Sequence, residues 1–395
     1  MVKCASLFSQ LLSVLNRNDF AAAVKSVQGD RAAKGFTCWD QLVAMLFCQI
    51  AQARSLREIS AGLRSCEGRL RHLGVEEAPK RSTLAYANAH RPWQLYERMF
   101  YSLLERVRLG APRTKFRFKN KLLSLDSSVI ELCVNSFEWA RISARKGALK
   151  LHLLLDHDGG LPVYVHLGDG RQHDIRMAWE ISLPKGAIVA VDRGYSDYWL
   201  FSRWTEEGVY FVTREKTSCA QDRVVERRPV PEGNHILRDE IIHHQAVHHS
   251  DTMHQEWRRV VVWLEDKQEE LVLLTNHRKL AASTIAAIYK ERWQIELFFK
   301  ALKQQLRVKT FVGTSPNAVH IQIWTALISM LLLKGLQMRS TLNWALSNLV
   351  ALLRWNLFSY RDLWTWIDAP YDTPPFPTDT GQFDLFLDST NMNRV

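Results

Sequence analysis

Tyr289-Lys-Glu-Arg292-Trp-Gln-Ile-Glu296-Leu-Phe-Phe-Lys-Ala-Leu-Lys303 is the most informative stretch of this 395-residue sequence. On a helix that turns by about 100° per residue, Arg292, Glu296 and Lys303 return to within about 60° of Tyr289. We therefore expect one helix with a carboxylate, two cations and a phenol on a single face. Large apolar side chains fill the other sides, so we expect a largely buried helix whose charged face needs partners. A row of surface charge pairs is the simpler interpretation of the same spacing.

Short apolar runs before this helix predict a mixed α/β sheet. Strand-like runs occupy residues 122–133, 148–156, 161–167, 187–192 and 209–213, with a helical candidate at 171–183. Three strands, a helix, a strand, a second helical stretch and a fifth strand, followed by the Glu296 helix, is the order of a ribonuclease-H-like (retroviral-integrase-like) fold. We assign residues 122–316 to this core. Further strand-like runs at about 215–280 predict a β-strand insertion, which we expect to interrupt the fold and not to extend it.

The positive charge of the chain is concentrated at its start. The formal net charge is +11, and residues 1–120 hold 20 Lys and Arg against 9 Asp and Glu, so the basic excess lies in the first third. This distribution favours nucleic acid as the partner, because no lipidation motif accompanies it. The most apolar stretch, 326–333, is too short for a membrane span of roughly 20 residues. We expect a soluble, cytoplasmic protein with no membrane contact.

Residues 1–110 have helical periodicity and predict an all-α amino-terminal DNA-binding domain. Ser55 is placed to cap one helix, and Ser82 or Thr83 the next. A short helix, a turn and a second helix with Arg81, Ser82 and Thr83 at its entrance are the ingredients of a helix-turn-helix DNA reader. A three-helix core that does not bind DNA has the same periodicity.

Residues 111–121 alternate cations with aromatic side chains and lead into the first strand. We interpret them as a basic linker in which Lys115, Arg117 and Lys119 follow DNA phosphates, and a solvated linker is the alternative. At the other end, residues 317–366 predict a helical carboxy-terminal region and residues 367–395 a loosely ordered tail.

Two aspartates follow apolar strands and are the candidate partners of Glu296. Asp126 ends Leu-Leu-Ser-Leu-Asp, and Asp192 ends Ala-Ile-Val-Ala-Val-Asp. Each alone could be a turn residue at the end of a strand. We reject Asp156 and Asp197 as ligands because they lie beyond their strands in turn-like surroundings. Three carboxylates are the hard oxygen ligands that Mg²⁺ or Mn²⁺ prefers, and two such ions can serve one scissile phosphate.

The spacing of Tyr289, Arg292, Glu296 and Lys303 resembles the Tyr-Arg-Glu-Lys signature of the insertion-sequence-4 family of DDE transposases, and all four positions match. The stretches around the two aspartates resemble the Asp motifs of these enzymes. Residues 36–42, Phe-Thr-Cys-Trp-Asp-Gln-Leu, resemble the amino-terminal module of one subgroup. The resemblance implies that Asp126, Asp192 and Glu296 are catalytic and bind two Mg²⁺ or Mn²⁺ ions.

The same resemblance implies that Tyr289, Arg292 and Lys303 bind DNA phosphates. It also implies cut-and-paste transposition in the prokaryotic cytosol or nucleoid. The protein would bind terminal inverted repeats, cleave the ends and join the 3′-ends to target DNA as a homodimer in a synaptic complex. Cleavage in this family commonly passes through a hairpin in which a tryptophan of the insertion holds a flipped base. Trp263 and Trp257 are the candidates, and core packing is the alternative for both.

Two other functions fit the same residues. A metal-dependent nuclease would use the same site without joining ends to a second DNA. A DNA-binding regulator descended from a transposase would not need three converging carboxylates.

Overall fold

The computed structural model describes residues 5–375 except 32, 67, 114, 134, 144–145, 172, 217–221, 231–234, 249–250 and 307–310. The amino-terminal part is helical, as expected. Its elements are α1 (Leu7–Ser13), α2 (Arg17–Ser26), α3 (Cys38–Ile50), α4 (Leu56–Arg64), the 3₁₀ helix η1 (Leu70–Leu73), α5 (Arg81–His90) and α6 (Gln94–Leu109). Most of the predicted tail, from residue 376 onward, lies outside the described residues.

Of the two helix N-caps predicted from the sequence in this part, the structure confirms one. Ser55 caps α4 by accepting a hydrogen bond from the Glu58 amide (3.2 Å). The prediction that Ser82 or Thr83 caps α5 is wrong, because this helix already begins at Arg81 and its N-cap Lys80 makes no side-chain hydrogen bond to it. Residues 65–80, including η1, separate α4 from α5, so the short turn expected between these two helices is not formed.

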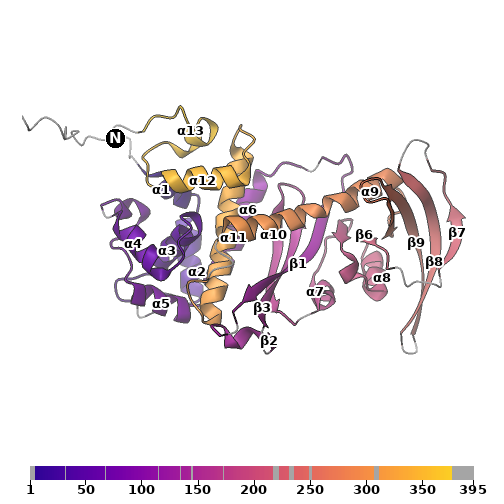
Figure 1. The fold of residues 1–395 in the computed structure, drawn as a ribbon, viewed down its shortest axis with the longest axis horizontal. Helices are drawn as coiled ribbons and strands as arrows, with labels where there is room; N and C mark the ends of the chain where they lie inside the picture. The colour runs from indigo at the N-terminus through magenta and orange to yellow at the C-terminus, as the bar shows by residue number, and fades with distance from the viewer. Residues whose placement is uncertain are drawn as a thin grey trace, which may run out of the picture.

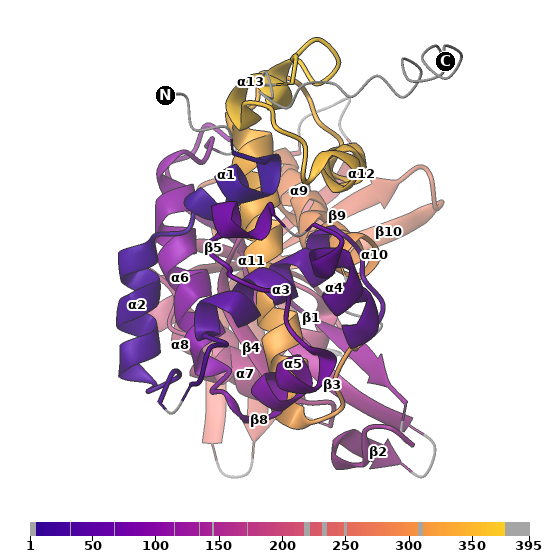
Figure 2. The same cartoon turned by 90° about the vertical axis from the view of Figure 1, so that its left-hand side faces the viewer.

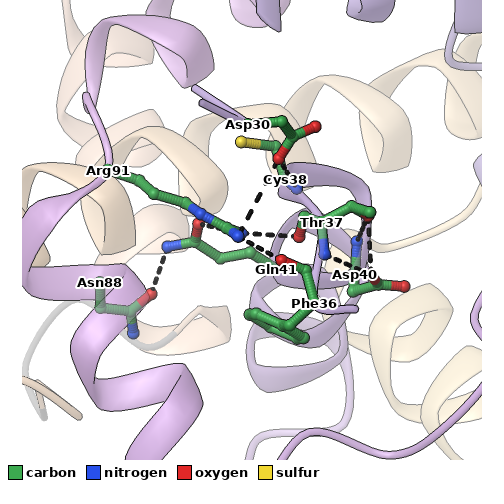
Figure 3. A network of polar contacts seen from close by, with 8 residues as sticks. All are labelled: Asp30, Phe36, Thr37, Cys38, Asp40, Gln41, Asn88 and Arg91. Atoms are coloured by element: carbon green, nitrogen blue, oxygen red, sulfur yellow. Dashed lines mark hydrogen bonds and ion pairs between the residues drawn. The ribbon is translucent and has the colours of Figure 1, made fainter. Parts of the chain in front are cut away.

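A polar network fixes the start of α3 against the end of α5 (Figure 3). The Arg91 guanidinium donates hydrogen bonds to the carbonyl oxygens of Phe36 and Thr37, the latter at 2.7 Å. Gln41 Nε2 donates to Asn88 Oδ1 (2.8 Å). These side chains are largely enclosed, so their bonds position the two helices and compensate for the loss of water.

The central helix α11 (Pro316–Arg339) runs between the amino-terminal helices and the sheet (Figures 1 and 2). The expectation of a short apolar segment is wrong, because this helix has 24 residues and is long and apolar enough to cross a membrane by length and composition alone. However, 83% of its most apolar 18-residue window is buried inside the protein. It is therefore the core helix of the fold. The helices α12 (Leu346–Asn356) and α13 (Leu363–Asp368) pack with α11 in one hydrophobic cluster.

The strands form one mixed sheet of ten. They are β1 (Leu122–Leu132), β2 (Arg141–Ser143), β3 (Lys146–Asp156), β4 (Leu161–Asp169), β5 (Ile188–Val191), β6 (Tyr210–Arg214), β7 (Arg223–Arg227), β8 (Ile236–His248), β9 (Asp251–Leu264) and β10 (Glu269–Thr275). Their order is β2-β3-β1-β5-β6-β10-β9-β8-β7, with β4 paired to β3. The pairs β1–β5 and β5–β6 are parallel, and the other pairs are antiparallel. The five predicted strands are present in the predicted order, and the mixed sheet is consistent with a ribonuclease-H-like fold.

The insertion consists of β-strands, but the expectation that it does not extend the fold is wrong. Strand β10 pairs antiparallel with β6, with Leu273 opposite Arg214 and Thr275 opposite Val212. Strands β9, β8 and β7 then follow in turn. A free strand edge readily pairs, and the edge of β6 is used for this continuation of the sheet.

Helices cover both faces of the sheet around its parallel strands. On one face lie α7 (Asp174–Glu180) and α8 (Tyr198–Glu206), which pack against Leu125, Val191 and Phe211. On the other lie α9 (Ala282–Glu291) and α10 (Trp293–Gln305). Helix α9 packs against Val212, and α10 contacts β1. The candidate site lies on this second face.

Candidate active site

The strand register brings Asp126 and Asp192 side by side. Leu125 of β1 is opposite Val191 of the parallel strand β5, and each aspartate is the next residue in its strand or directly after it. Side chains alternate between the faces of a sheet. Because Leu125 and Val191 pack toward α7 and α8, both aspartates face α9 and α10.

The predicted single helix is two helices that meet at Arg292. This residue ends α9 and precedes α10, with φ −49° and ψ −32°. Its amide bonds to the Tyr289 carbonyl and its own carbonyl accepts from the Ile295 amide, both at the shorter i to i+3 spacing. The tightened turn bends the path only slightly, so α9 and α10 run nearly in line (Figure 1).

The helix is less buried than expected. Ile295, Phe298 and Phe299 are buried, but 55% of Trp293 and 41% of Leu297 are exposed. One apolar side of α10 therefore faces outward beside the carboxylates.

Arg292 connects the carboxylates of two different elements. Its Nη2 lies 2.6 Å from Glu296 Oε1, and its Nη1 lies 3.5 Å from Asp126 Oδ2. The guanidinium is 13% exposed, and its Nε is buried with no hydrogen-bond partner in the described structure. Burial lowers the pKa of Arg292, but the hydrogen bond and negative charge of Glu296 raise it above its usual value. The cation is thus held firmly in its charged form.

The carboxylates crowd one another. The pKa of Asp126 is raised to about 6. Burial is the main cause, the Ser127 amide and Arg292 oppose it, and the charges of Asp192 and Glu296 add to it. Nearby negative charges destabilise the ionised form of a carboxyl group, and the single cation Arg292 offsets this destabilisation only in part. The site is therefore suited to additional positive charge.

Tyr289 and Lys303 extend the site along β1 and α9. The Arg292 guanidinium carbon lies 5.7 Å from the centre of the Tyr289 ring. Burial raises the pKa of the Tyr289 hydroxyl, so it remains a proton donor. Lys303 Nζ donates to the Val129 carbonyl of β1 at 2.7 Å, three residues beyond Asp126. The structure therefore brings the signature residues to one face, with Lys303 at its far end.

The oxygen-only donor set of Asp126, Asp192 and Glu296 fits a hard divalent cation. In the part of the chain that the structure describes, however, no group of three or more His, Cys, Asp or Glu residues is close enough to hold a metal ion. Arg292 binds two of the three carboxylates instead.

The two rejected aspartates have other contacts. Asp156 Oδ2 pairs with Lys121 Nζ at 2.8 Å, and Asp156 lies opposite Leu123 at the start of β1. Asp197 caps α8 by accepting from the Leu200 amide at 3.0 Å. Neither carboxylate is in contact with Glu296 in these interactions.

The predicted linker residues lie on the outside of the core. Phe116 and Phe118 stack at 4.9 Å and pack against the α9 face of the sheet, while Lys115, Arg117 and Lys119 are exposed. Lys115 forms an ion pair with Glu291 at the end of α9. The aromatic residues thus anchor the linker and leave its cations at the surface.

The predicted DNA-reading residues are remote from the carboxylates. Arg81 and Ser82 are exposed and Thr83 is half-buried at the start of α5. This helix lies on the far side of α11 from the sheet (Figure 1). The structure does not bring these residues to the candidate active site.

The two tryptophans of the insertion differ in accessibility. Trp257 is fully buried, 5.1 Å from the His244 ring and 5.5 Å from Tyr198, so it is a core residue. Trp263 is half-buried and lies opposite Glu270 on β10. Because β10 runs past the end of β6, Trp263 lies on the part of the insertion that extends beyond the edge carrying Asp192.

Sequence reasoning missed Arg214, the last residue of β6. It follows Thr213, which is in register with Val191, so it lies beside Asp192. The available signal was the alternation in Tyr210-Phe-Val-Thr-Arg214, which puts Arg214 on the same face as Val212. The register of β6 against β5 cannot be read from the sequence of one strand.

Comparison with known sequences shows the family of the chain. The sequence profile described as "Transposase DDE domain" matches residues 117–332, which is more than half of the chain. A domain of unknown function, DUF4372, matches residues 3–76. The chain therefore belongs to the transposase DDE domain family.

Three relatives with transposase names come from bacteria. The first, y4zB of Sinorhizobium fredii, is 30% identical over 303 residues, which are 75% of this chain and 82% of the relative. The protein named for insertion sequence element IS5377 of Geobacillus stearothermophilus is 25% identical over 65% of this chain and 67% of its own length. The protein named for element IS4SA of Synechocystis is 25% identical over 64% and 70%.

Among solved structures, a cryo-EM structure of the piggyBac transposase synaptic complex with hairpin DNA aligns with 89% of this chain and 79% of its own. The sequence identity is 10% and the TM-score 0.43, which is too low to support a conclusion. The sequence relatives make the protein a DDE-type transposase of an insertion sequence. Transposase DDE domains generally use divalent metal ions.

Proposed function

We propose that this transposase binds the terminal inverted repeats of its element, cleaves the ends and joins the 3′-ends to target DNA. We also propose that it belongs to the insertion-sequence-4 family. The observation that carries the proposal is the convergence of Asp126, Asp192 and Glu296 with Arg292 on one face of the sheet, in a chain of this family.

Asp126, Asp192 and Glu296 would hold Mg²⁺ or Mn²⁺, two ions per site. Bound divalent ions supply an activated attacking oxygen and stabilise the leaving 3′-oxygen of an in-line displacement. The raised pKa of Asp126 supports this assignment, because a carboxylate crowded by like charges gains from a nearby cation. The three carboxylates would repel the DNA phosphates, so a protein that only binds DNA would gain nothing from them.

The cations and phenol of α9 and α10 would hold the DNA backbone. Arg292 offers a planar fork of donors that matches a phosphate, and the Tyr289 hydroxyl remains protonated. Lys303 would bind a phosphate at the far end of the site. With these groups the chain positions the scissile bond without a covalent enzyme intermediate.

The other parts of the chain would bind the rest of the DNA. Arg81, Ser82 and Thr83 on α5 would read the inverted repeat, and Lys115, Arg117 and Lys119 would follow phosphates between the two regions. Trp263 would stack on a flipped base at a hairpin end, since it is half-exposed beyond the edge of β6. We propose a homodimer in the synaptic complex.

Cleavage and joining of a labelled duplex that carries the end of the element test this proposal. We expect wild type to cleave and to join the 3′-end to a second duplex only with Mg²⁺ or Mn²⁺. Glu296→Gln should lose at least about 100-fold of both rates, in the range found when a group that stabilises the transition state is removed. Glu105→Gln, at an exposed position of α6, is the matched control and should behave as wild type.

Cleavage without joining would instead assign a nuclease. Specific binding without cleavage by any variant would assign a DNA-binding protein and would exclude the catalytic roles.

A further inference from the structure

Three neighbouring strands carry a row of charged residues at one level of the sheet. Leu125 of β1 is in register with Val191 of β5, and Val191 is in register with Thr213 of β6. The residues that follow are Asp126, Asp192 and Arg214. Parallel strands lie about 4.8 Å apart, so the Arg214 backbone is about 5 Å from that of Asp192 and about 10 Å from that of Asp126.

Arg214 faces the same side of the sheet as the two aspartates. Phe211 packs against α8, and Val212 packs against Ile285 and Ile288 of α9. By alternation Arg214, two residues after Val212, points toward α9. Its charge acts on Tyr289 of that helix, where it opposes the effect of burial on the pKa of the hydroxyl.

Among the residues that the structure describes, no acidic side chain pairs with Arg214, unlike Arg258 and Arg259. In the same sheet, Arg259 pairs with Glu215 and Asp222, and Arg258 pairs with Asp239. Arg214 is half-buried, and its side chain makes neither a hydrogen bond nor an ion pair with any residue that the structure describes. A partly desolvated guanidinium gains most from a bidentate anion such as a phosphate.

We propose that Arg214 binds the DNA phosphate next to the cleaved bond, on the side of the β-strand insertion. This inference rests on the proposed function. Arg292 lies at the β1 end of the row and Arg214 at the β6 end, so the bound DNA strand crosses β1, β5 and β6 at the level of this row.

The first test is the salt dependence of binding to the end duplex, measured by fluorescence anisotropy with a chelator so that no cleavage occurs. Each phosphate contact contributes about 0.9 to the slope of log K against log salt concentration. We expect Arg214→Gln to reduce this slope by about 1 and the affinity by about tenfold at moderate salt. Arg214→Lys should keep the slope, because its charge remains.

Arg227→Gln is the matched control. Arg227 lies on β7 of the same sheet with 82% of its side chain exposed, near Glu240. It should bind with the wild-type slope and affinity. Thermal unfolding of each variant checks its folding. If Arg214→Gln is unfolded, Arg214→Lys tests the inference instead. It should then weaken end binding, because lysine cannot make the bidentate contact.

The second test identifies the phosphate. In a series of end duplexes, one phosphate at a time near the cleavage position is replaced by an uncharged methylphosphonate. Replacing the phosphate at one position should lower the affinity of wild type about tenfold. The same replacement should not lower the affinity of Arg214→Gln any further. Additive losses at every position, or an unchanged salt slope, would overturn the inference while leaving the proposed function intact. Failure of wild type to bind or cleave the end would reject the proposed function and this inference with it.

Discussion

At the scale of single residues, Arg292 determines the charge balance of the active site. It joins Glu296 and Asp126 across two elements, whereas Asp192 forms no ion pair with any residue in the part of the chain that the structure describes. The net effect of burial and of the three neighbouring charges is an Asp126 pKa of about 6. The site is therefore bridged by a cation of the chain itself but is still short of positive charge.

Because the pKa of Asp126 is raised in the folded state, its contribution to stability is present below its usual pKa of 3.8 and is lost as the pH rises through about 6. From about pH 4 to about pH 7, chelated wild type should therefore lose about 3 kcal/mol relative to Asp126→Asn, at about 1.4 kcal/mol per pKa unit. Urea unfolding of both proteins across this range measures the difference. Two curves that stay parallel with pH would contradict it.

At the scale of elements, the strand insertion is fixed to the active-site helices by a buried ion pair. Arg258 Nη2 lies 2.7 Å from Asp239 Oδ2, with side chains 1% and 6% exposed, and joins β9 to β8. Arg258 Nη1 also donates to the carbonyls of His277 (3.2 Å) and Leu280 (2.5 Å), just before α9. One guanidinium thus holds the insertion and the start of the helix that carries Tyr289.

Arg258→Met should destabilise the protein by about 3–5 kcal/mol, because it leaves the Asp239 carboxylate buried without its counter-ion. Arg238→Met is the control on the neighbouring strand. Its partner Glu270 lies at 2.8 Å, but the side chains are 53% and 45% exposed, so the loss should stay below about 1 kcal/mol. Urea unfolding compares the two variants, and equal small losses would show that the buried pair is dispensable.

At the scale of the whole molecule, the amino-terminal helices and the sheet share α11. Trp324 of this helix lies 5.3 Å from the Phe100 ring and 6.4 Å from Trp93 of the amino-terminal part. One hydrophobic cluster runs from Leu7 to Ile367 and includes the sheet residues Leu151 and Leu153. DNA held by the two parts would therefore be positioned by one continuous core.

A fragment of residues 111–395 should not fold as the full chain does, since it exposes the face of α11 that packs against α3 and α6. We expect the fragment to aggregate or to unfold without a cooperative transition, whereas the full chain unfolds in one transition. Circular dichroism in the far and near ultraviolet, followed with temperature, measures both. A fragment with native spectra and a sharp transition would show that residues 1–110 are an independent domain.

Local patterns were enough to predict the elements. Apolar alternation located the five core strands, and the spacing from Tyr289 to Lys303 located the charged helix face. The cap at Ser55 was also correct, because it depends only on neighbouring residues. The cap of α5 was wrong because helix starts are decided by packing as well as by local hydrogen bonds.

The DDE transposase family followed from the sequence by itself, since short motifs record the chemistry that the residues must supply. The catalytic roles of Asp126, Asp192 and Glu296 stay predictions. Only the tertiary structure decided that the insertion continues the sheet, that Trp257 is buried and that Arg292 binds two carboxylates. It also decided that Arg214 lies in the row of Asp126 and Asp192. Strand pairing and register join residues that are distant in the chain, and no local pattern within a single strand specifies its neighbour.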